Sequence, residues 1–318
     1  MLAFLPAPLR GVLAFLLFIL NTLFWCLLLY AVTLLKLAIP QRGWRAFHAR
    51  LLTHLAEAWI DCNNAIMELT QRIEWDVQEP AELRRDASYL VSSNHQSWVD
   101  IVVLQRVFNR RIPFLKFFIK QQLLWVPVLG GAWWALDFPF MKRHSSTYLA
   151  QHPEARDQDW ETTRRMCARF RDIPISMINF LEGTRFRPDK HARQQSPYRH
   201  LLRPKAGGMA FVMETLADQL RTLLDVTIVY PDGCSSFGDL FAGRIQRVIV
   251  RVRQLPVPTE LLGGNYRHDP EFRAAIQNWV SQLWTDKDAL IEQLLCSARS
   301  APAKPEPPKA RLSSGQYP

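Results

Sequence analysis

Cysteine is scarce in this chain and forms no pattern. The 318 residues include five cysteines that lie far apart, with neither a CxxC pair nor a cluster with histidine at metal-ligand spacing. Neither a disulfide framework nor a zinc site is indicated, and we expect no metal. Scattered thiols suit a reducing compartment, so we expect the soluble part of the chain to face the cytosol.

Several functional signatures are also missing. The chain has no GxSxG elbow of hydrolases, no GxxxxGK[ST] phosphate loop, and no helix-turn-helix, RNP or zinc-finger pattern. The formal net charge of +10 favours anionic partners, and membrane surfaces, nucleic acids and phosphorylated small molecules all qualify by charge. Because no nucleic-acid signature accompanies the charge, we expect no nucleic-acid partner.

A long apolar run stands near the N-terminus. From Gly11 to Leu35 the sequence has no charged residue, and the run exceeds the roughly 20 residues needed to cross a bilayer. Asn21 and Thr22 interrupt it, so the run either spans the membrane or forms a kinked, re-entrant hairpin. Only Arg10 precedes the run, whereas four basic residues follow it: Lys36, Arg42, Arg45 and Arg50. By the positive-inside rule, the long C-terminal part lies in the cytoplasm.

Composition divides the chain into four parts. We expect a membrane-embedded segment over residues 1–40, an amphipathic helix over 41–70, an α/β domain over 71–300 and a disordered tail over 301–318, which is rich in Pro and Ser. Within the amphipathic helix, one face carries Trp44, Phe47, Leu51, Leu55 and Trp59. This face packs either against a protein core or against lipid headgroups, and the spacing fits both.

Short apolar or β-branched runs alternate with helical patterns after Pro80, which predicts an α/β fold with helices flanking a mixed central sheet. The predicted strands are residues 72–78, 88–93, 114–120, 137–141, 175–181, 226–231 and 246–255. The predicted helices are 98–108, 160–171, 208–221 and 271–295. The strands ISMINFL (175–181) and VTIVYP (226–231) are almost wholly apolar, so we expect them to lie inside the sheet.

His95 and Asp100 lie just after a predicted strand, where active sites of α/β sheets gather. A histidine can deprotonate an alcohol, and a carboxylate bonded to its other ring nitrogen fixes the tautomer. Five positions of separation in a regular helix would point the two side chains about 140° apart. The pair therefore works only if His95 precedes the first helical turn, where Asn94 and Ser97 are candidate caps.

A second polar stretch, EGTR, follows the predicted strand 175–181. Gly183 lets the backbone approach a ligand, Thr184 offers a hydroxyl, and Arg185 can bind a phosphate through two nitrogens. Two further cations follow predicted strand or loop ends. Arg143 is a second candidate phosphate ligand, and Lys205 leads into a helix whose N-terminal amides can meet an anion. The alternative for both Arg143 and Lys205 is that they are ordinary solvent-exposed cations with no ligand.

These motifs, in this order and spacing, resemble the lysophospholipid acyltransferase family that includes the 1-acylglycerol-3-phosphate acyltransferases. The likeness covers roughly residues 85–235. Its first motif, N-H-x-S-x-x-D, is matched by Asn94, His95, Ser97 and Asp100. The resemblance implies the glycerolipid acyltransferase fold and a base role for His95, oriented by Asp100. It also implies that Glu182 and Arg185 bind glycerol phosphate, with Gly183 and Thr184 shaping their loop.

Two departures from the family pattern are visible. Where many members read F-P-E-G-T-R-S, this chain has Leu181 and Phe186 in place of the proline and the serine. The second motif appears as GGAWWALDFPFMKR, which is longer and richer in tryptophan. Both forms look more like the branch that acylates lysophosphatidate, lysocardiolipin or lysophosphatidylinositol. The acceptor is therefore open within this group.

The sequence predicts an O-acyltransferase that moves a fatty acyl group to the sn-2 hydroxyl of a lysophospholipid, first of all 1-acylglycerol-3-phosphate. The donor is acyl-CoA or an acylated carrier protein, and no bound cofactor is expected. The expected location is a bacterial inner membrane, in contact with its lipids, and the oligomeric state is left open. One rival is a non-catalytic, basic, membrane-tethered binding protein, which leaves NHQSWVD and EGTR unexplained. Another is a hydrolase, for which Ser97 is the only nearby nucleophile.

Overall fold

The computed structural model describes residues 2, 5–141, 173–234 and 236–300, together with positions 161, 162, 164, 165, 167 and 170. Three of the sequence predictions fall elsewhere. Arg143, half of the helix predicted over residues 160–171, and the tail predicted over 301–318 lie outside the described residues.

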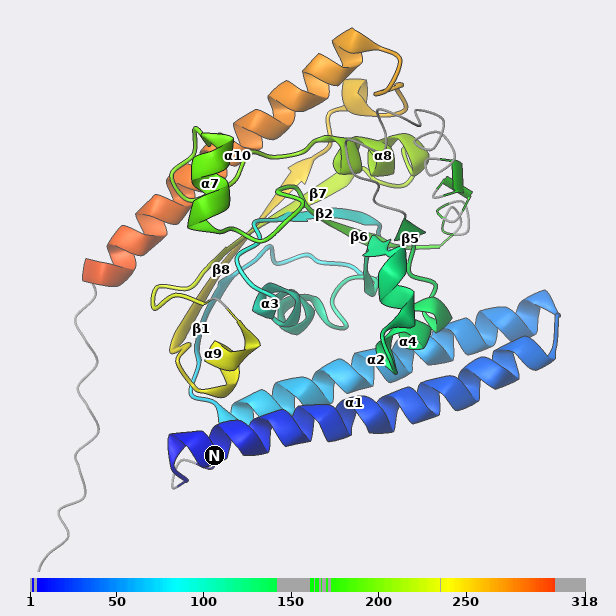
Figure 1. Ribbon diagram of the computed structural model, residues 1–318. Coiled ribbons are helices and arrows are strands. Elements are labelled where there is room, and N and C mark those ends of the chain that lie inside the picture. The colour runs from blue at the N-terminus through cyan, green and yellow to red at the C-terminus, as the bar shows by residue number, and fades with distance from the viewer. Residues whose placement is uncertain are drawn as a thin grey trace, which may run out of the picture.

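Two long helices at the N-terminus, α1 (Ala7–Ala38) and α2 (Arg42–Thr70), form a hairpin along one side of the α/β domain (Figure 1). α1 runs unbroken through Asn21 and Thr22, so residues 11–35 form no re-entrant hairpin of their own. The polar pair faces α2 instead. Asn21 Nδ2 donates to Asn63 Oδ1 at 2.9 Å, and Trp59 Nε1 donates to the Thr22 hydroxyl at 3.2 Å. The interruption in the apolar run is therefore a helix–helix contact.

The α/β domain holds α1 near both of its ends. Close to the N-terminus, Phe15 and Phe18 meet the ring of Phe241 edge-on, with centroids 5.6 and 5.3 Å apart. Phe241 ends the short helix α9 (Phe237–Phe241). Near the other end of α1, Lys36 pairs with Asp137 at 3.0 Å. The domain thus contacts α1 near both of its ends.

Apolar side chains cover the free sides of α1. Leu27 and Leu34 are each 70% exposed, and most of the apolar run is likewise accessible. Within the part of the chain that the structure describes, α1 is the one helix long and apolar enough to cross a membrane. Such exposure is costly in water and indicates membrane association.

α2 packs against the protein through a face that differs from the predicted one. The buried stripe includes Leu52, Ala56 and Ile60, one position along from the predicted stripe. Phe47, which belongs to the predicted apolar face, is 60% exposed. Polar residues share the buried face: the carboxylate of Glu57 is paired with arginines of the α/β domain. The predicted apolar face lies beside it and is partly exposed, so its contact with core or headgroups stays a prediction.

Six strands form a mixed sheet in the order β1-β8-β7-β2-β6-β3, and all neighbouring pairs are parallel except β7 with β8. Their bounds are β1 Glu74–Gln78, β2 Tyr89–Ser93, β3 Leu115–Phe117, β6 Ser176–Phe180, β7 Thr222–Val229 and β8 Arg247–Pro256. The predicted fold class is confirmed. The predicted strand 114–120 is divided between β3 and β4 (Ile119–Lys120), which pairs with β5 (Phe140–Met141) in a separate two-stranded sheet.

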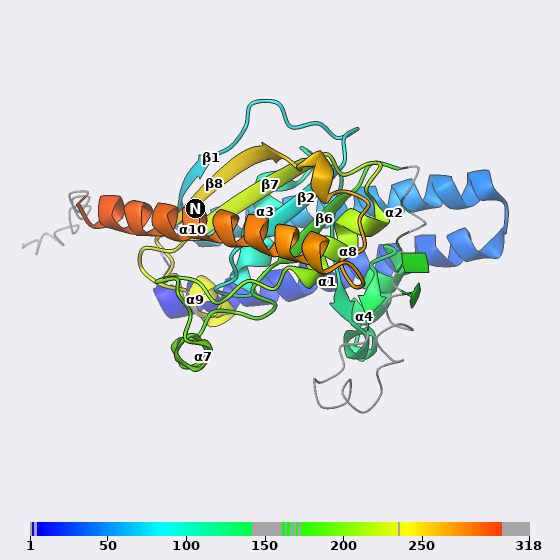
Figure 2. The same cartoon turned by 90° about the horizontal axis from the view of Figure 1, so that it is seen from above.

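Helices cover both faces of the sheet (Figures 1 and 2). α3 (Val99–Phe108) packs on one face, with the α1–α2 hairpin beyond it, and α8 (Gly207–Thr215) and α10 (Pro270–Ser300) pack on the other. Strand β7 shows why two cores form, because alternate residues point to opposite faces. Leu224 and Ile228 join the α3 core, whereas Leu223 and Val229 join the α8–α10 core. The remaining elements are η1 Gln121–Trp125, α4 Leu129–Ala135, α7 Pro188–Gln194 and η3 Thr259–Leu261.

Candidate active site

Three loops meet at one edge of the sheet because the strands before them are parallel neighbours. β2 pairs with β6 and β7, and the register places Ser93 opposite Phe180 and Val226. The chain leaves β2 toward α3, leaves β6 into the EGTR loop, and leaves β7 through Tyr230. Such an edge, at the carboxyl ends of strands, is where α/β proteins place their active sites.

His95 and Asp100 form a direct hydrogen bond at this edge. His95 Nδ1 lies 2.8 Å from Asp100 Oδ2, and the carboxylate is fully buried. α3 begins at Val99, so His95 precedes the first helical turn, which is the condition that the five-residue spacing imposes. The same Asp100 oxygen accepts the backbone amides of Gln96 and Ser97, at 2.6 and 2.9 Å. The carboxylate therefore fixes the loop as well as the imidazole.

The two predicted caps have other partners. The Asn94 side chain pairs with the backbone of β7, donating to the Ile228 carbonyl at 2.8 Å and accepting the Ile228 amide at 2.9 Å. It thereby ties the His95 loop to the neighbouring strand. The Ser97 hydroxyl is buried and accepts the Val99 amide at 3.2 Å, so it supports the start of α3.

Aromatic rings position the imidazole. The His95 ring stacks on Phe180, the last residue of β6, with centroids 4.0 Å apart and an interplanar angle of 19°. Trp98 stands edge-on at 6.4 Å. His95 keeps 8% of its surface exposed. With Nδ1 directed at Asp100, Nε2 is the ring nitrogen left for a substrate.

The carboxyl group of Glu182 joins two backbone segments. Oε1 accepts the His95 amide at 2.9 Å, and Oε2 accepts the Leu202 amide at 3.1 Å. The side chain is fully buried, and this burial raises its pKa to about 8. Both oxygens of Glu182 are thus bonded to backbone amides, and the glycerol phosphate contact that the family resemblance implies stays a prediction. Its position is that of a clamp between the His95 loop and the loop that follows EGTR.

The rest of the EGTR loop carries the exposed polar groups. Gly183 has φ of +66°, and a methyl group built on it would lie 3.4 Å from the Lys205 side chain, so Gly183 lets Lys205 pack on the loop. The Arg185 guanidinium lies 5.1 Å from the ring centre of Trp98. The Thr184 hydroxyl accepts Lys190 Nζ at 2.5 Å. Arg185 and Lys205 are thus brought to the same edge as His95.

One residue of the site was not singled out from the sequence. The Tyr230 hydroxyl donates to Asp100 Oδ1 at 2.7 Å, and the side chain is 4% exposed. Tyr230 stands in the apolar run VTIVYP, where its position just past a buried strand was the one available signal. Its partner lies 130 positions earlier in the chain.

Comparison with known proteins identifies the family. Residues 74–231 match the family model described as Acyltransferase. The mouse 1-acyl-sn-glycerol-3-phosphate acyltransferase gamma is 26% identical over 188 residues, covering 56% of this chain and 45% of that protein. Lysocardiolipin acyltransferase 1 of Danio rerio is 24% identical over 307 residues, covering 89% and 71%. The chain belongs to the lysophospholipid acyltransferase family.

A solved structure shows the same fold as this chain. The crystal structure of the 1-acyl-sn-glycerophosphate acyltransferase from Thermotoga maritima matches with a TM-score of 0.51 and 15% identity, covering 94% of this chain and all of that one. The chain spans only 59% and 45% of the length of two of its curated relatives.

The two departures of this chain from the family pattern in the third motif, Leu181 and Phe186, each make a contact in the structure. Leu181, in place of the usual proline, is fully buried in the core shared with α8 and α10. Phe186, in place of the usual serine, donates its backbone amide to the His95 carbonyl at 2.7 Å. Leu181 therefore anchors the EGTR loop in the core through its side chain, whereas the bond at position 186 is made by the backbone and does not depend on the phenylalanine side chain.

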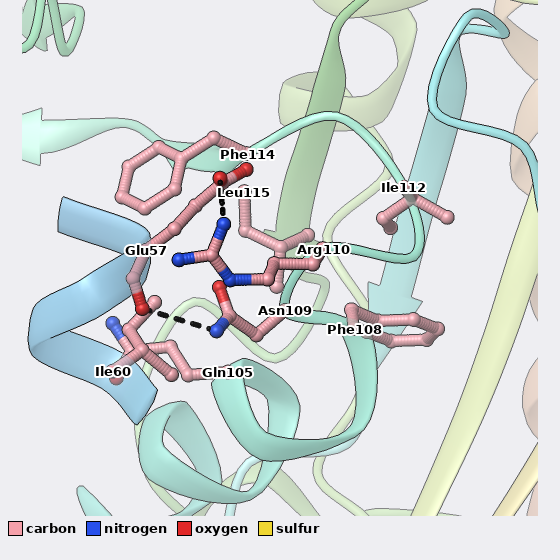
Figure 3. Close-up of a pocket in the computed structure, with 9 residues that line it drawn as sticks. All are labelled: Glu57, Ile60, Gln105, Phe108, Asn109, Arg110, Ile112, Phe114 and Leu115. Carbon is pink, nitrogen blue, oxygen red and sulfur yellow. Dashed lines mark hydrogen bonds and ion pairs between the residues drawn. The ribbon is translucent and has the colours of Figure 1, made fainter. Parts of the chain in front are cut away.

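A small cavity lies away from this edge of the sheet, between α2 and the end of α3 (Figure 3). Its volume of about 10 Å³ holds roughly one water molecule. Arg110 Nη1 crosses it to reach Glu57 Oε2 at 3.2 Å, and Asn109 Nδ2 donates to the Glu57 carbonyl at 3.1 Å. The cavity is a polar joint between the hairpin and α3, too small for a substrate.

Proposed function

We propose that this protein transfers a fatty acyl group from an acyl thioester to a free hydroxyl of a lysophospholipid. The observation that carries the proposal is the buried His95–Asp100 pair, 2.8 Å apart, at the edge of the sheet where Arg185 and Lys205 also lie. A histidine base that is oriented by a carboxylate but has no nucleophile of its own suits transfer to an external alcohol. The Ser97 hydroxyl, the candidate nucleophile of a hydrolase, is buried and accepts the Val99 amide.

The reaction follows from the two ring nitrogens of His95. Nε2 takes the proton from the acceptor hydroxyl as that oxygen attacks the thioester carbonyl carbon. The carbon–sulfur bond then breaks, and the imidazolium returns the proton to the leaving thiolate. Asp100 stabilises the imidazolium while it exists and keeps Nε2 directed at the substrate. The products are an ester and a free thiol, so the step needs no bound cofactor.

The acceptor is proposed to be 1-acylglycerol-3-phosphate, acylated at its sn-2 hydroxyl to give phosphatidate. Arg185 and Lys205 supply the positive charge for its phosphate, since a guanidinium binds a phosphate through two parallel hydrogen bonds. The mouse gamma relative is named for activity on this acceptor. Lysocardiolipin is the acceptor in the name of another relative, and its headgroup offers the same phosphate chemistry.

The membrane placement proposed for this enzyme follows from the contacts of α1. The α/β domain touches α1 near both ends, through Phe241 and through Asp137. A helix whose two ends both touch the same domain cannot pass straight through a bilayer while that domain stays on one side of the membrane. We therefore place α1 along a membrane surface, with the active site facing the cytoplasm of a bacterial cell. A lysolipid then arrives from the bilayer, and acyl-CoA or an acylated carrier protein arrives from the cytoplasm.

The experiment that tests this function is a transfer assay with purified membranes. Labelled acyl-CoA or acyl-carrier protein is supplied with lysophosphatidate, lysocardiolipin, lysophosphatidylinositol or monoacylglycerol. Product with a phosphate-bearing acceptor is the expected result, with lysophosphatidate the best. Absence of product with every pairing of donor and acceptor would favour a non-catalytic binding protein.

Replacing Arg185 with alanine is expected to raise the KM for lysophosphatidate by about 10- to 100-fold, because a charged hydrogen-bond pair to phosphate is lost. The kcat should change by less than about threefold, since the phosphate contact orients the acceptor and does not move a proton. The matched control is Arg187→Ala, two positions along the same loop, where the guanidinium pairs with Asp189 at 2.9 Å. An equal rise in KM for monoacylglycerol, which has no phosphate, would contradict the assignment.

A further inference from the structure

The Asp100 carboxylate is held from two sides. Oδ2 accepts His95 Nδ1 and two backbone amides of the same loop. Oδ1 accepts the hydroxyl of Tyr230 at 2.7 Å, from a different strand. The bonds on Oδ2 move together with the His95 loop, because donors and acceptor belong to one segment. The bond from Tyr230 ties the Asp100 carboxylate directly to the end of β7.

We propose that Tyr230 is a positioning residue of the transfer reaction, which orients the Asp100 carboxylate and draws part of its charge away from His95. The inference rests on the proposed base role of His95. The hydroxyl of Tyr230 acts only through Asp100 and has no contact with the imidazole. Its two expected effects are a fixed direction for Nε2 and a weaker attraction of Asp100 for the imidazolium.

The position of Tyr230 is rigid and its hydroxyl remains a donor. It follows directly after β7, which pairs with β2 and β8 inside the sheet, and the next residue is Pro231. Burial, and then the nearby charge of Asp100, raise the pKa of Tyr230 well above its ordinary value of 10. The phenol therefore stays protonated at every pH at which the enzyme is assayed.

Two other titratable groups, Glu182 and Cys234, also interact with Asp100. Glu182 interacts with it from the β6 side, and Cys234 interacts with it from the loop after β7. Burial raises the pKa of the Cys234 thiol to about 11, so this group stays neutral. Glu182, with a pKa of about 8, titrates within the assay range. Glu182 titrates in the wild type and in a Tyr230 variant alike. A difference between their pH–rate profiles therefore reports the loss of the Tyr230 hydroxyl.

The test compares Tyr230→Phe with Tyr89→Phe in the same transfer assay. Tyr89 is the matched control because it is 3% exposed, lies in β2, and uses its hydroxyl to accept the Arg84 amide at 3.0 Å, away from Asp100. In Tyr230→Phe we expect kcat to fall about 10-fold, with the KM for the acceptor within about twofold. The acid limb of the pH–rate profile should move to higher pH by roughly one unit, because Asp100 then attracts the imidazolium more strongly. Tyr89→Phe should show neither change.

Fluorotyrosine at position 230 gives a second variant that keeps the ring and the hydroxyl. It is a stronger donor, so it should move the acid limb in the opposite direction, to lower pH. If the acid limb stays at the wild-type pH in both variants, Tyr230 has a structural role only and the proposal is overturned. This failure is distinct from failure of the proposed function, which would appear as absence of transfer by the wild type or as transfer that survives removal of His95.

Discussion

Replacement of His95 with alanine is expected to lower kcat for acyl transfer by about 10²- to 10⁴-fold, the contribution of a general base placed next to its substrate. The physical reason is specific to this ring. It lies 2.8 Å from a fully buried carboxylate through Nδ1 and is stacked on Phe180, so both its tautomer and its direction are fixed. Without it, the acceptor hydroxyl has no acceptor for its proton as it attacks the thioester.

The measurement for His95→Ala is initial rate with labelled acyl-CoA and lysophosphatidate, normalised to the amount of protein in the membrane. His268→Ala is the control, since His268 is exposed in the loop before α10. The KM for lysophosphatidate should stay close to the wild-type value, because the imidazole is not part of the phosphate contact. Transfer by His95→Ala within tenfold of the wild-type rate would remove His95 as the base.

The sequence predicts the parts of this fold that depend on local patterns. Strands β2, β6 and β7 are apolar runs, and each run ends where polar motif residues begin, so the loops of the site can be placed on one edge. The same local reasoning sets the condition on His95, which must precede α3 to reach Asp100. The structure meets this condition, since α3 begins at Val99.

Contacts between distant segments are what the sequence leaves open. Glu182 reaches the His95 amide across 87 positions, and Tyr230 reaches Asp100 across 130. Both contacts depend on the register of β2 with β6 and β7, which residue types alone do not specify. The sequence therefore singles out Glu182 as a phosphate-binding residue but does not reveal its contacts with the two backbone amides. It does not single out Tyr230 at all.

α10 contains another contact between distant segments that the sequence does not predict. Lys287 is fully buried and lies 2.7 Å from the Asp225 carboxylate of β7. A lysine in a helical pattern normally indicates a solvent-facing position, and nothing near it in the sequence marks the exception. The prediction of short elements from sequence fails for a different reason. α4 spans seven residues, too few for helical periodicity to stand out.

Replacement of Glu182 with alanine is expected to lower the free energy of unfolding by about 3–5 kcal/mol. Two buried backbone amides, those of His95 and Leu202, would lose their acceptor, which costs about 1–3 kcal/mol each, and a small cavity would add to the loss. Activity should fall with it, because the amide of the catalytic histidine is one of the two groups that Glu182 holds. The measurement is denaturant unfolding of the detergent-solubilised protein, with the exposed Glu271→Ala as control.

Glu182→Gln removes the titration of this side chain while keeping its size, although its single acceptor oxygen can hold only one of the two buried amides. The pKa of Glu182 rises from 4.5 to about 8 on folding, because burial disfavours the carboxylate. Below pH 4.5 the group is protonated in both the folded and the unfolded protein. Between that pH and about 8 the folded protein holds a proton that the unfolded chain has released, so the free energy of unfolding falls as pH rises through this window.

Glutamine does not titrate. The free energy of unfolding of the wild type should therefore fall relative to that of Glu182→Gln as the pH rises from 5 to 8.5. Parallel stability curves for the two proteins over this range would show that the carboxyl group does not change its protonation on folding. An unchanged KM for a phosphate-bearing acceptor in Glu182→Gln, together with lower stability from the amide that loses its acceptor, would favour the clamp between the two loops over a phosphate contact. A selective rise in KM with unchanged stability would return Glu182 to the phosphate-binding role that its motif predicts.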